Sequence, residues 1–344
     1  MDSHGHGGDI FAYENIRYDF SVNINPLGMP ESVKRAVAAH ISDFETYPDT
    51  KYRALRAAIS DMEQQNASHI VCGNGAADLI YRLCQSIKPE NVLVCAPSFS
   101  EYERAAAQAG ANILVHRLAE DNGFCLTDNI LGDITEDINM VFLCSPNNPT
   151  GAVIPFELIE KAAGKAAENN ALLVLDECFL DFTDAKSAKS LILTYGNLVI
   201  LKAFTKIFAM AGLRLGYILC SDSDVLEKVD LTGQCWSVSA PAQYAGIAAC
   251  KLSDFVSRTR ELISRERSFL TRGLRSLGLT VFSSNANFLL LRCALPLKEM
   301  LLEKGILIRS CLNFRSLDDS YFRVAVKARE ANTALLDALG EVLR

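Results

Sequence analysis

Short apolar segments alternate with amphipathic segments from about residue 68 to residue 220. Continuous apolar runs of this kind are typical of strands that are buried on both faces, and the segments between them have the spacing of amphipathic helices. The alternation predicts an α/β fold, with a mainly parallel sheet covered by helices on both faces. The expected strands are HIVCG, NVLVCA, NMVFLC, ALLVLDE, LVILKA and LGYILC.

The pattern changes after about residue 250. A long, arginine-rich helical stretch at 252–278 is followed by strand-like segments at 280–284, 286–292, 305–310 and 321–326, and by a last helix at 329–344. This order predicts a smaller α+β domain at 251–344, beside a large domain at 46–250. Residues 1–45 have no strong sheet pattern, and we expect them to pack with the small domain and the substrate site.

Composition excludes several classes of protein. The net charge of −7 argues against a nucleic-acid or anionic-membrane surface as the main partner, and hydrophobic residues make up 49% of the 344 residues. No apolar run approaches the roughly 20 residues of a membrane helix. The eleven cysteines are scattered without a CxxC pair, and the first residues lack a signal-peptide pattern. Both features predict a cytoplasmic protein with reduced cysteines and no metal.

Two loops that follow predicted strands offer groups for binding. Gly73-Asn74-Gly75 follows HIVC and begins a helix, where free backbone amides can bind an anion. The same glycines also suit a turn required only for steric reasons. The loop SPNNPTG at 145–151 is made rigid by two prolines, and Asn147 and Asn148 can donate hydrogen bonds.

Two later features carry charge into apolar segments. Asp176 ends the run ALLVLD, and a buried carboxylate needs a hydrogen-bonding or cationic partner. Lys206 and Arg214 lie in AFTKIFAMAGLRLGY. A lysine can form a Schiff base with an aldehyde cofactor, and a buried aspartate can keep a pyridine nitrogen protonated. Lys206 alone could equally be a surface lysine with a buried stem, but the four features together favour a cofactor site.

Three motifs of this chain are SPNNPTG, LDE and FTKIFAMAGLRLGY. With these motifs, nearly the whole chain resembles the fold-type I pyridoxal-phosphate enzymes of the aminotransferase class I and II family. The resemblance implies a large domain with a mainly parallel seven-stranded sheet, and pyridoxal 5′-phosphate as the cofactor. It implies these roles: Lys206 for the covalent link, Asp176 for the ring nitrogen, Asn148 for the ring oxygen, Tyr102 for stacking on the ring, and Arg214 with the amides of Gly75 and Ala76 for the phosphate.

The resemblance also implies a homodimer with shared active sites, because Tyr47 would reach the cofactor phosphate of the neighbouring subunit. One position departs from the family: Ala203 stands where a serine or threonine commonly contacts the cofactor phosphate. Thr205 is the nearest hydroxyl, and we expect it beside the cofactor.

Two branches of the family are the most similar: the histidinol-phosphate aminotransferases and the threonine-phosphate decarboxylases. Four segments resemble the decarboxylase branch: HGHGGDI, DFSVNINPLGMP, ILIRSCLNF and YFRVAV. In addition, Phe179 stands where aminotransferases commonly carry a tyrosine. The resemblance implies that Arg323 meets the substrate carboxylate, and that His6, Gly7, Asn25 and Arg309 line the pocket for the substrate phosphate.

The chemistry of a phosphorylated amino acid supports such a pocket, because a second anion site is needed and arginine offers two parallel donors. The alternatives for single residues are a mobile terminus for His6 and surface positions for Arg309 and Arg323.

The implied function is decarboxylation of O-phospho-L-threonine, with O-phospho-L-serine as a second candidate substrate, for the nucleotide loop of cobalamin. An aminotransferase acting on histidinol phosphate or a related amino acid is the alternative, and dependence on 2-oxoglutarate would reveal it. A non-catalytic binding protein of the same fold is a third hypothesis, which the presence of both Lys206 and Asp176 disfavours.

Overall fold

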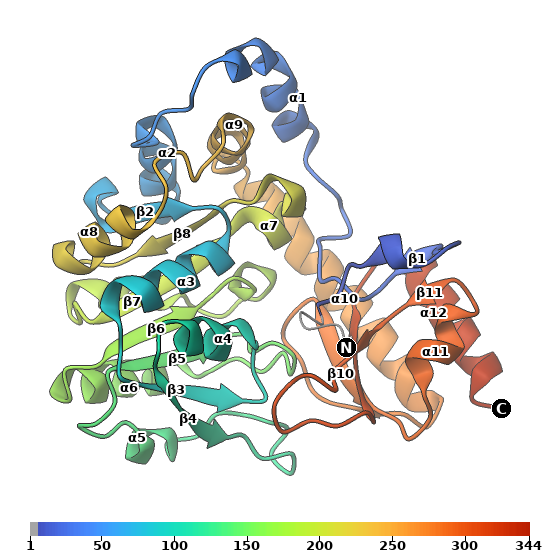
Figure 1. Cartoon of the computed structure of the whole chain (residues 1–344). Helices are drawn as coiled ribbons and strands as arrows, with labels where there is room; N and C mark the ends of the chain where they lie inside the picture. The colour runs from blue at the N-terminus through green and yellow to red at the C-terminus, as the bar shows by residue number, and fades with distance from the viewer. Residues whose placement is uncertain (1–5) are drawn as a thin grey trace.

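The computed structural model describes residues 6–344 and contains a seven-stranded, a four-stranded and a two-stranded sheet (Figure 1). The strand order of the large sheet is β2-β8-β7-β6-β5-β3-β4. Among these seven strands, β8 runs antiparallel to both of its neighbours, β2 and β7, and all other neighbouring pairs are parallel. The strands are β2 (Ile70–Gly73), β3 (Asn91–Ala96), β4 (Asn112–Arg117), β5 (Met140–Cys144), β6 (Leu172–Asp176), β7 (Leu198–Ala203) and β8 (Gly216–Leu219).

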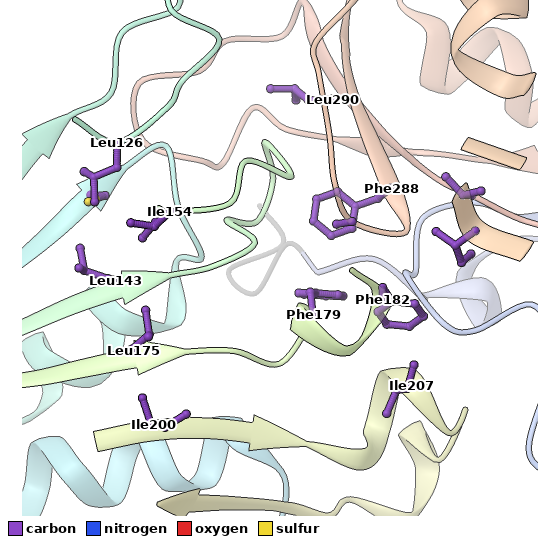
Figure 2. Close-up of a cluster of buried hydrophobic side chains, with 14 of the residues drawn as sticks. Leu126, Leu143, Ile154, Leu175, Phe179, Phe182, Ile200, Ile207, Phe288 and Leu290 are labelled. Atoms are coloured by element: carbon purple, nitrogen blue, oxygen red, sulfur yellow. The ribbon is translucent and has the colours of Figure 1, made fainter. Parts of the chain in front are cut away.

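Helices cover both faces of this sheet, and alternate strand residues pack against each layer. Val174 of β6 belongs to the core formed with α3, α4 and α8, whereas Leu175 belongs to the core formed with α2, α6 and α9. The second core continues through Phe179 to Phe288 in the C-terminal part (Figure 2). The helices are α1 (Glu31–Ala39), α2 (Arg53–Glu63), α3 (Ala76–Ile87), α4 (Glu101–Gln108), α5 (Ile130–Asp133), α6 (Phe156–Glu168), α7 (Phe204–Ile207), α8 (Ser223–Thr232), α9 (Ala240–Ala249), α10 (Ser253–Ser276), α11 (Leu297–Leu302) and α12 (Arg329–Val342).

The predicted α/β fold is therefore confirmed, although the apolar pattern missed one strand. β4 lies at the edge of the sheet, and its residues alternate between exposed and half-buried. A half-exposed edge strand lacks the continuous apolar run that marks the central strands. No helix in residues 6–344 is long and apolar enough to cross a membrane.

The C-terminal part forms an antiparallel sheet in the order β12-β13-β10-β9. Its strands are β9 (Thr280–Val281), β10 (Phe288–Arg292), β12 (Arg309–Ser310) and β13 (Tyr321–Ala325). The N-terminal segment contacts both parts of the molecule, because β1 (Tyr18–Asp19) pairs with β11 (Ile306–Leu307), whereas α1 packs against α9. The predicted domain boundaries stay a prediction.

A glycine sets the position of the β2–α3 loop on the sheet. Gly216 of β8 pairs with Gly73 and Ala203 in the two adjacent strands. A Cβ atom at Gly216 would lie 2.6 Å from the amide nitrogen of Ala76 and 2.8 Å from the carbonyl carbon of Gly75. The missing side chain thus lets the start of α3 lie directly against the edge of the sheet where the parallel strands end.

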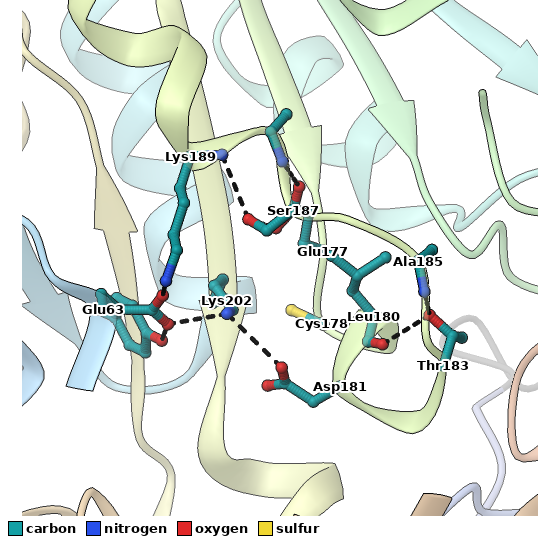
Figure 3. A network of polar contacts seen from close by, with 12 residues as sticks. Glu63, Glu177, Cys178, Leu180, Asp181, Thr183, Ala185, Ser187, Lys189 and Lys202 are labelled. Atoms are coloured by element: carbon teal, nitrogen blue, oxygen red, sulfur yellow. Dashed lines mark hydrogen bonds and ion pairs between the residues drawn. The ribbon is translucent and has the colours of Figure 1, made fainter. Parts of the chain in front are cut away.

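A buried ionic network connects β7 with the end of α2 (Figure 3). Glu63, at the end of α2, is 3% exposed. Its carboxylate accepts hydrogen bonds from Lys202 and Lys189, both at 2.8 Å, and from the hydroxyl of Tyr217. Lys202 Nζ also lies 3.7 Å from a carboxylate oxygen of Asp181. Each buried charge therefore has an opposite charge beside it, which offsets the cost of removing it from water.

This network predicts a contribution to stability that depends on pH. Burial raises the pKa of Glu63, but the charges of Lys202 and Lys189 outweigh burial and lower it to about 2. Because the folded pKa lies below the unfolded value, the stabilisation is complete above about pH 4.5 and is lost as the pH falls toward 2. Glu63→Gln should lower the free energy of unfolding at pH 7 by about 3–5 kcal/mol.

Urea unfolding at pH 7 and at pH 3 measures both effects. Glu120→Gln is the matched control, because Glu120 pairs with Arg292 at 2.6 Å with both side chains exposed. Its loss should be about 0–1 kcal/mol. Equal losses in the two variants would contradict a special role of the buried network.

Candidate active site

The carboxyl ends of the parallel strands face a cavity of about 310 Å³. The large sheet, the N-terminal segment and the C-terminal sheet all contribute to its walls. The predicted site residues that line it are His6, Gly7, Ala76, Tyr102, Asn148, Asp176, Thr205, Lys206, Arg214, Arg309 and Arg323. Gly75, Asn25 and Tyr47 are predicted site residues that do not line it.

Asp176 ends β6 and is 5% exposed. One carboxylate oxygen accepts the hydroxyl of Tyr102 at 2.7 Å, and the other accepts the amide of Cys178 at 2.9 Å. Burial raises the pKa of Asp176, and the hydrogen bonds from Cys178 and Tyr102 oppose that shift. The carboxylate is thus held in one orientation, and it is suited to accept a hydrogen bond from a protonated nitrogen in the cavity.

Tyr102 lines the cavity but offers little free surface for the predicted stacking on a cofactor ring. The side chain is 1% exposed, and its ring stacks on Phe142 with centroids 5.0 Å apart. Its hydroxyl is engaged by Asp176. Phe99, three residues earlier, is half-buried, lines the cavity and packs edge-on against Tyr102. Phe99 therefore takes over as the candidate for stacking.

Lys206 lies in α7, the short helix that directly follows β7. Its side chain is half-buried and lines the cavity. Burial lowers the pKa of Lys206, and the nearby positive charges of Arg323 and Arg214 lower it further, to about 8. A larger fraction of this amine is neutral near neutral pH than for an ordinary lysine, and the neutral amine is the nucleophile.

Arg214 and the start of α3 form an anion site. Arg214 has a left-handed backbone (φ +60°), and a Cβ atom at Gly75 would lie 2.7 Å from its Nη2. Gly75 therefore provides space for the guanidinium. The amide of Gly75 is not available to a ligand, because it donates to the carbonyl of Gly73 at 2.8 Å. Ala76 and Ala77 of the first helical turn line the cavity instead.

Arg323 of β13 reaches the cavity from the C-terminal sheet and is 7% exposed. Its Nη1 donates to the side-chain oxygen of Asn148 at 2.5 Å, and its Nη2 donates to the carbonyl of Ser21 at 2.8 Å. Its Nε has no hydrogen-bond partner among residues 6–344. Burial lowers the pKa of Arg323 to about 10, so it stays charged at neutral pH. A buried donor without a partner favours binding of an anionic ligand there.

The structure does not bring Asn25 into the cavity. Its side-chain amide donates to the carbonyl of Ile207 at 2.7 Å and to the hydroxyl of Thr259 at 2.8 Å, and its oxygen accepts the amide of Leu27 at 3.0 Å. Asn25 therefore supports α7 from outside the cavity. Asn23, which the sequence analysis missed, lines the cavity, and its buried side-chain oxygen has no partner in the described chain.

The remaining predicted residues lie as follows. Arg309 lines the cavity, and its Nη2 donates to the side-chain oxygen of Asn313 at 2.6 Å. Tyr47 is 78% exposed, and its ring stacks on Trp236 with centroids 4.5 Å apart. Tyr47 thus lies on the surface, outside the cavity.

Comparisons with known proteins identify the family. Residues 16–339 match the family aminotransferase class I and II, and the chain belongs to this family. It is 40% identical to threonine-phosphate decarboxylase of Salmonella typhimurium, over 98% of this chain and 96% of that protein.

Solved structures include histidinol-phosphate aminotransferase from Clostridium acetobutylicum, with a TM-score of 0.89, 33% identity, and coverage of 95% of this chain and 99% of that chain. L-threonine-O-3-phosphate decarboxylase from Porphyromonas gingivalis has a TM-score of 0.84, 26% identity, and coverage of 94% of this chain and 98% of that chain. The fold is that of the fold-type I enzymes, as predicted.

The cofactor of this family is pyridoxal 5′-phosphate. The cavity fits it, because a nucleophilic amine, a buried carboxylate and an anion site all face the same space. The space beside Gly75, which a Cβ atom would fill, receives the guanidinium of Arg214 at that anion site.

The lowered pKa of Lys206 predicts a measurable titration. In cofactor-free protein, reaction of its amine with acetic anhydride should rise with pH and reach half of its maximum near pH 8. Arg214→Gln should raise the pKa of Lys206, because a neighbouring positive charge disfavours protonation. Arg292→Gln, a surface change outside the cavity lining, should leave the profile unchanged. Mass spectrometry of the labelled peptide gives the profile, and an unshifted profile in Arg214→Gln would contradict this interpretation.

Proposed function

We propose that the protein decarboxylates O-phospho-L-threonine, with O-phospho-L-serine as a second candidate substrate. The observation that carries the proposal is a second set of donors in the cavity, apart from the set at the start of α3. His6, Arg309 and Arg323 come from the N-terminal segment and the C-terminal sheet, whereas Arg214 and Ala76 come from the large domain. A cofactor phosphate and a substrate with its own phosphate and carboxylate require two such sets.

In this proposal the cofactor is held by residues of the large domain. Lys206 would form the covalent link, Asp176 would pair with the ring nitrogen, Phe99 would stack on the ring, and Asn148 would bind the ring oxygen. Arg214, Thr205 and the amides at the start of α3 hold the phosphate. When bound, pyridoxal 5′-phosphate supplies an electron sink for the bonds at the substrate's Cα.

The substrate is oriented by the other set of donors. Arg323 binds the carboxylate through its unpartnered Nε, and His6, Gly7 and Arg309 bind the phosphate. The orientation of the substrate selects the bond that breaks at Cα, and binding of the remote phosphate by these residues would fix that orientation. After carbon dioxide leaves, Lys206 Nζ delivers a proton to Cα, and 1-amino-2-propanol phosphate is released. We place this product in cobalamin synthesis.

Phe179 supports decarboxylation over amino transfer. It lines the cavity, is 7% exposed and packs edge-on against Phe288 with centroids 5.0 Å apart. It therefore offers no hydroxyl at the position where aminotransferases commonly carry a tyrosine, which changes how the cofactor's electrons are tuned. The similarity to histidinol-phosphate aminotransferase in three dimensions keeps amino transfer as the second candidate.

A homodimer with shared sites is also part of the proposal. Large apolar side chains are exposed at Ile41, Tyr47, Leu231 and Trp236, and Tyr47 and Trp236 stack on each other. The contact of Tyr47 with Trp236 joins two exposed aromatic rings, and contiguous apolar surface is typical of protein interfaces. Tyr47 would reach the cofactor phosphate of the partner subunit from this surface. The cytoplasmic location stays a prediction.

A product assay tests the reaction type. Cofactor-loaded protein is incubated with O-phospho-L-threonine or O-phospho-L-serine, without any keto acid, and carbon dioxide and the amine product are measured. We expect carbon dioxide and the corresponding amine phosphate, and no turnover by Lys206→Ala. If no carbon dioxide forms, but amino transfer occurs with histidinol phosphate and 2-oxoglutarate, the aminotransferase assignment is correct and ours is wrong.

Mixing of inactive variants tests the shared sites. Lys206→Ala removes the nucleophile, and Tyr47→Phe removes the hydroxyl that would serve the other subunit. Refolding a mixture of the two should restore about a quarter of the sites, because half of the dimers are mixed and each then has one complete site. Light scattering measures the mass of the same samples. A monomer, or a mixture no more active than its parents, would rule out shared sites.

A further inference from the structure

An acidic residue lines the cavity that is proposed to bind two phosphates. Glu101 begins α4, is 8% exposed and lines the cavity beside Phe99 and Tyr102. None of the roles assigned above uses it. A bare carboxylate at this place would repel an anionic substrate, so its neighbours decide what it does.

Both oxygens of Glu101 are engaged by side chains. His6 Nε2 lies 2.9 Å from Oε1, and the hydroxyl of Tyr81 donates to Oε2 at 2.8 Å. Arg104 Nη1 lies 3.9 Å from Oε1. The hydrogen bond from His6 is the largest influence on the pKa of Glu101 and lowers it, burial opposes the shift, and Tyr81 adds to it. Glu101 is therefore an ionised acceptor for the imidazole.

The backbone beside His6 is also fixed in place. A Cβ atom at Gly7 would lie 2.3 Å from the carbonyl oxygen of Ser21, so only glycine fits against the backbone at Ser21. The amide of Gly8 donates to Ser21 Oγ at 2.8 Å. The imidazole of His6 lies 5.9 Å from the ring of Phe99, measured between centroids. These contacts disfavour the alternative that His6 belongs to a mobile terminus.

We infer that Glu101 is a positioning residue for substrate binding: it accepts the Nε2–H of His6 and so fixes the orientation in which the Nδ1–H of the imidazolium donates to the substrate phosphate. An imidazole whose Nε2–H donates to a carboxylate has only Nδ1 left for a ligand, and Nδ1 donates to a phosphate oxygen when it also carries a proton. Glu101 itself touches neither substrate nor cofactor in this arrangement. The inference rests on the proposed phosphate pocket and adds the residue that orients one of its donors.

A positioning role and a simple repulsive charge predict opposite changes in phosphate affinity when Glu101 is removed. If Glu101 were only a negative charge in the cavity, its removal would tighten phosphate binding. If it orients His6, its removal weakens binding, and the effect disappears once His6 is gone. The sign of the change therefore separates the two hypotheses without any assumption about the reaction.

The probe is inorganic phosphate, titrated into cofactor-loaded protein and followed by calorimetry, so that the cofactor's own phosphate site is already filled. Glu101→Gln should weaken binding by about tenfold, as expected for a lost charge-assisted hydrogen bond. His6→Ala should weaken it by a similar factor, and the double variant should be no weaker than His6→Ala alone. Glu103→Gln is the matched control, because Glu103 lies on the same turn of α4, pairs with Arg315 and does not line the cavity.

Tyr81→Phe provides a second variant in case Glu101→Gln fails to fold. It removes one of the two donors to Glu101 and should weaken phosphate binding in the same direction, by a smaller factor. Tighter or unchanged binding in Glu101→Gln, or an equal loss in the His6→Ala background, would overturn the inference. With O-phospho-L-threonine, we expect Glu101→Gln to raise KM and to leave kcat nearly unchanged.

The two proposals fail in different ways. Absence of carbon dioxide from O-phospho-L-threonine refutes the proposed reaction, whereas the phosphate titration still decides the role of Glu101. Phosphate binding that weakens as expected, together with inactive protein, would support the positioning role for a different phosphorylated substrate.

Discussion

The guanidinium of Arg323 joins three parts of the chain, and the shape of the site depends on it. It is buried, and it donates to Asn148 in the loop after β5 and to Ser21 in the N-terminal segment, while Arg323 itself belongs to β13. A buried charge is tolerated only when hydrogen bonds replace water. The large sheet, the N-terminal segment and the C-terminal sheet therefore meet at this guanidinium, and all three line the cavity beside it.

The two faces of the central strands separate two kinds of charge. On one face, burial raises the pKa of Asp176, and just beyond the end of β7 burial lowers the pKa of Lys206, so both shifts favour the neutral forms. On the other face, Lys202 and Glu63 are kept charged by each other. The alternation of side chains along β7 and β6 lets a reactive cluster and a stabilising cluster use the same backbone without sharing contacts.

A residue's place in the site could be predicted from the sequence when local pattern sets it, but not when contacts with distant segments set it. Asp176 ends a buried strand and Lys206 follows one by three residues, so apolar runs of the chain located them. Local patterns did not distinguish Phe99 from Tyr102, or Asn23 from Asn25, because which member of each pair faces the cavity depends on packing against distant segments. Glu101 was missed for the same reason, since its partner His6 lies 95 residues away and nothing in the local sequence marks the pair.

The placement of residues 6–8 has a practical consequence for anyone who produces the protein. His6 and Gly7 lie in the wall of the cavity, with Gly7 pressed against Ser21, so a purification tag at the amino terminus would be attached only five residues from that wall. The other end of the chain, after α12, lies outside the cavity lining and away from the large sheet (Figure 1). A carboxy-terminal tag is therefore the appropriate choice for kinetic work, and amino-terminal fusions need to be removed before measurement.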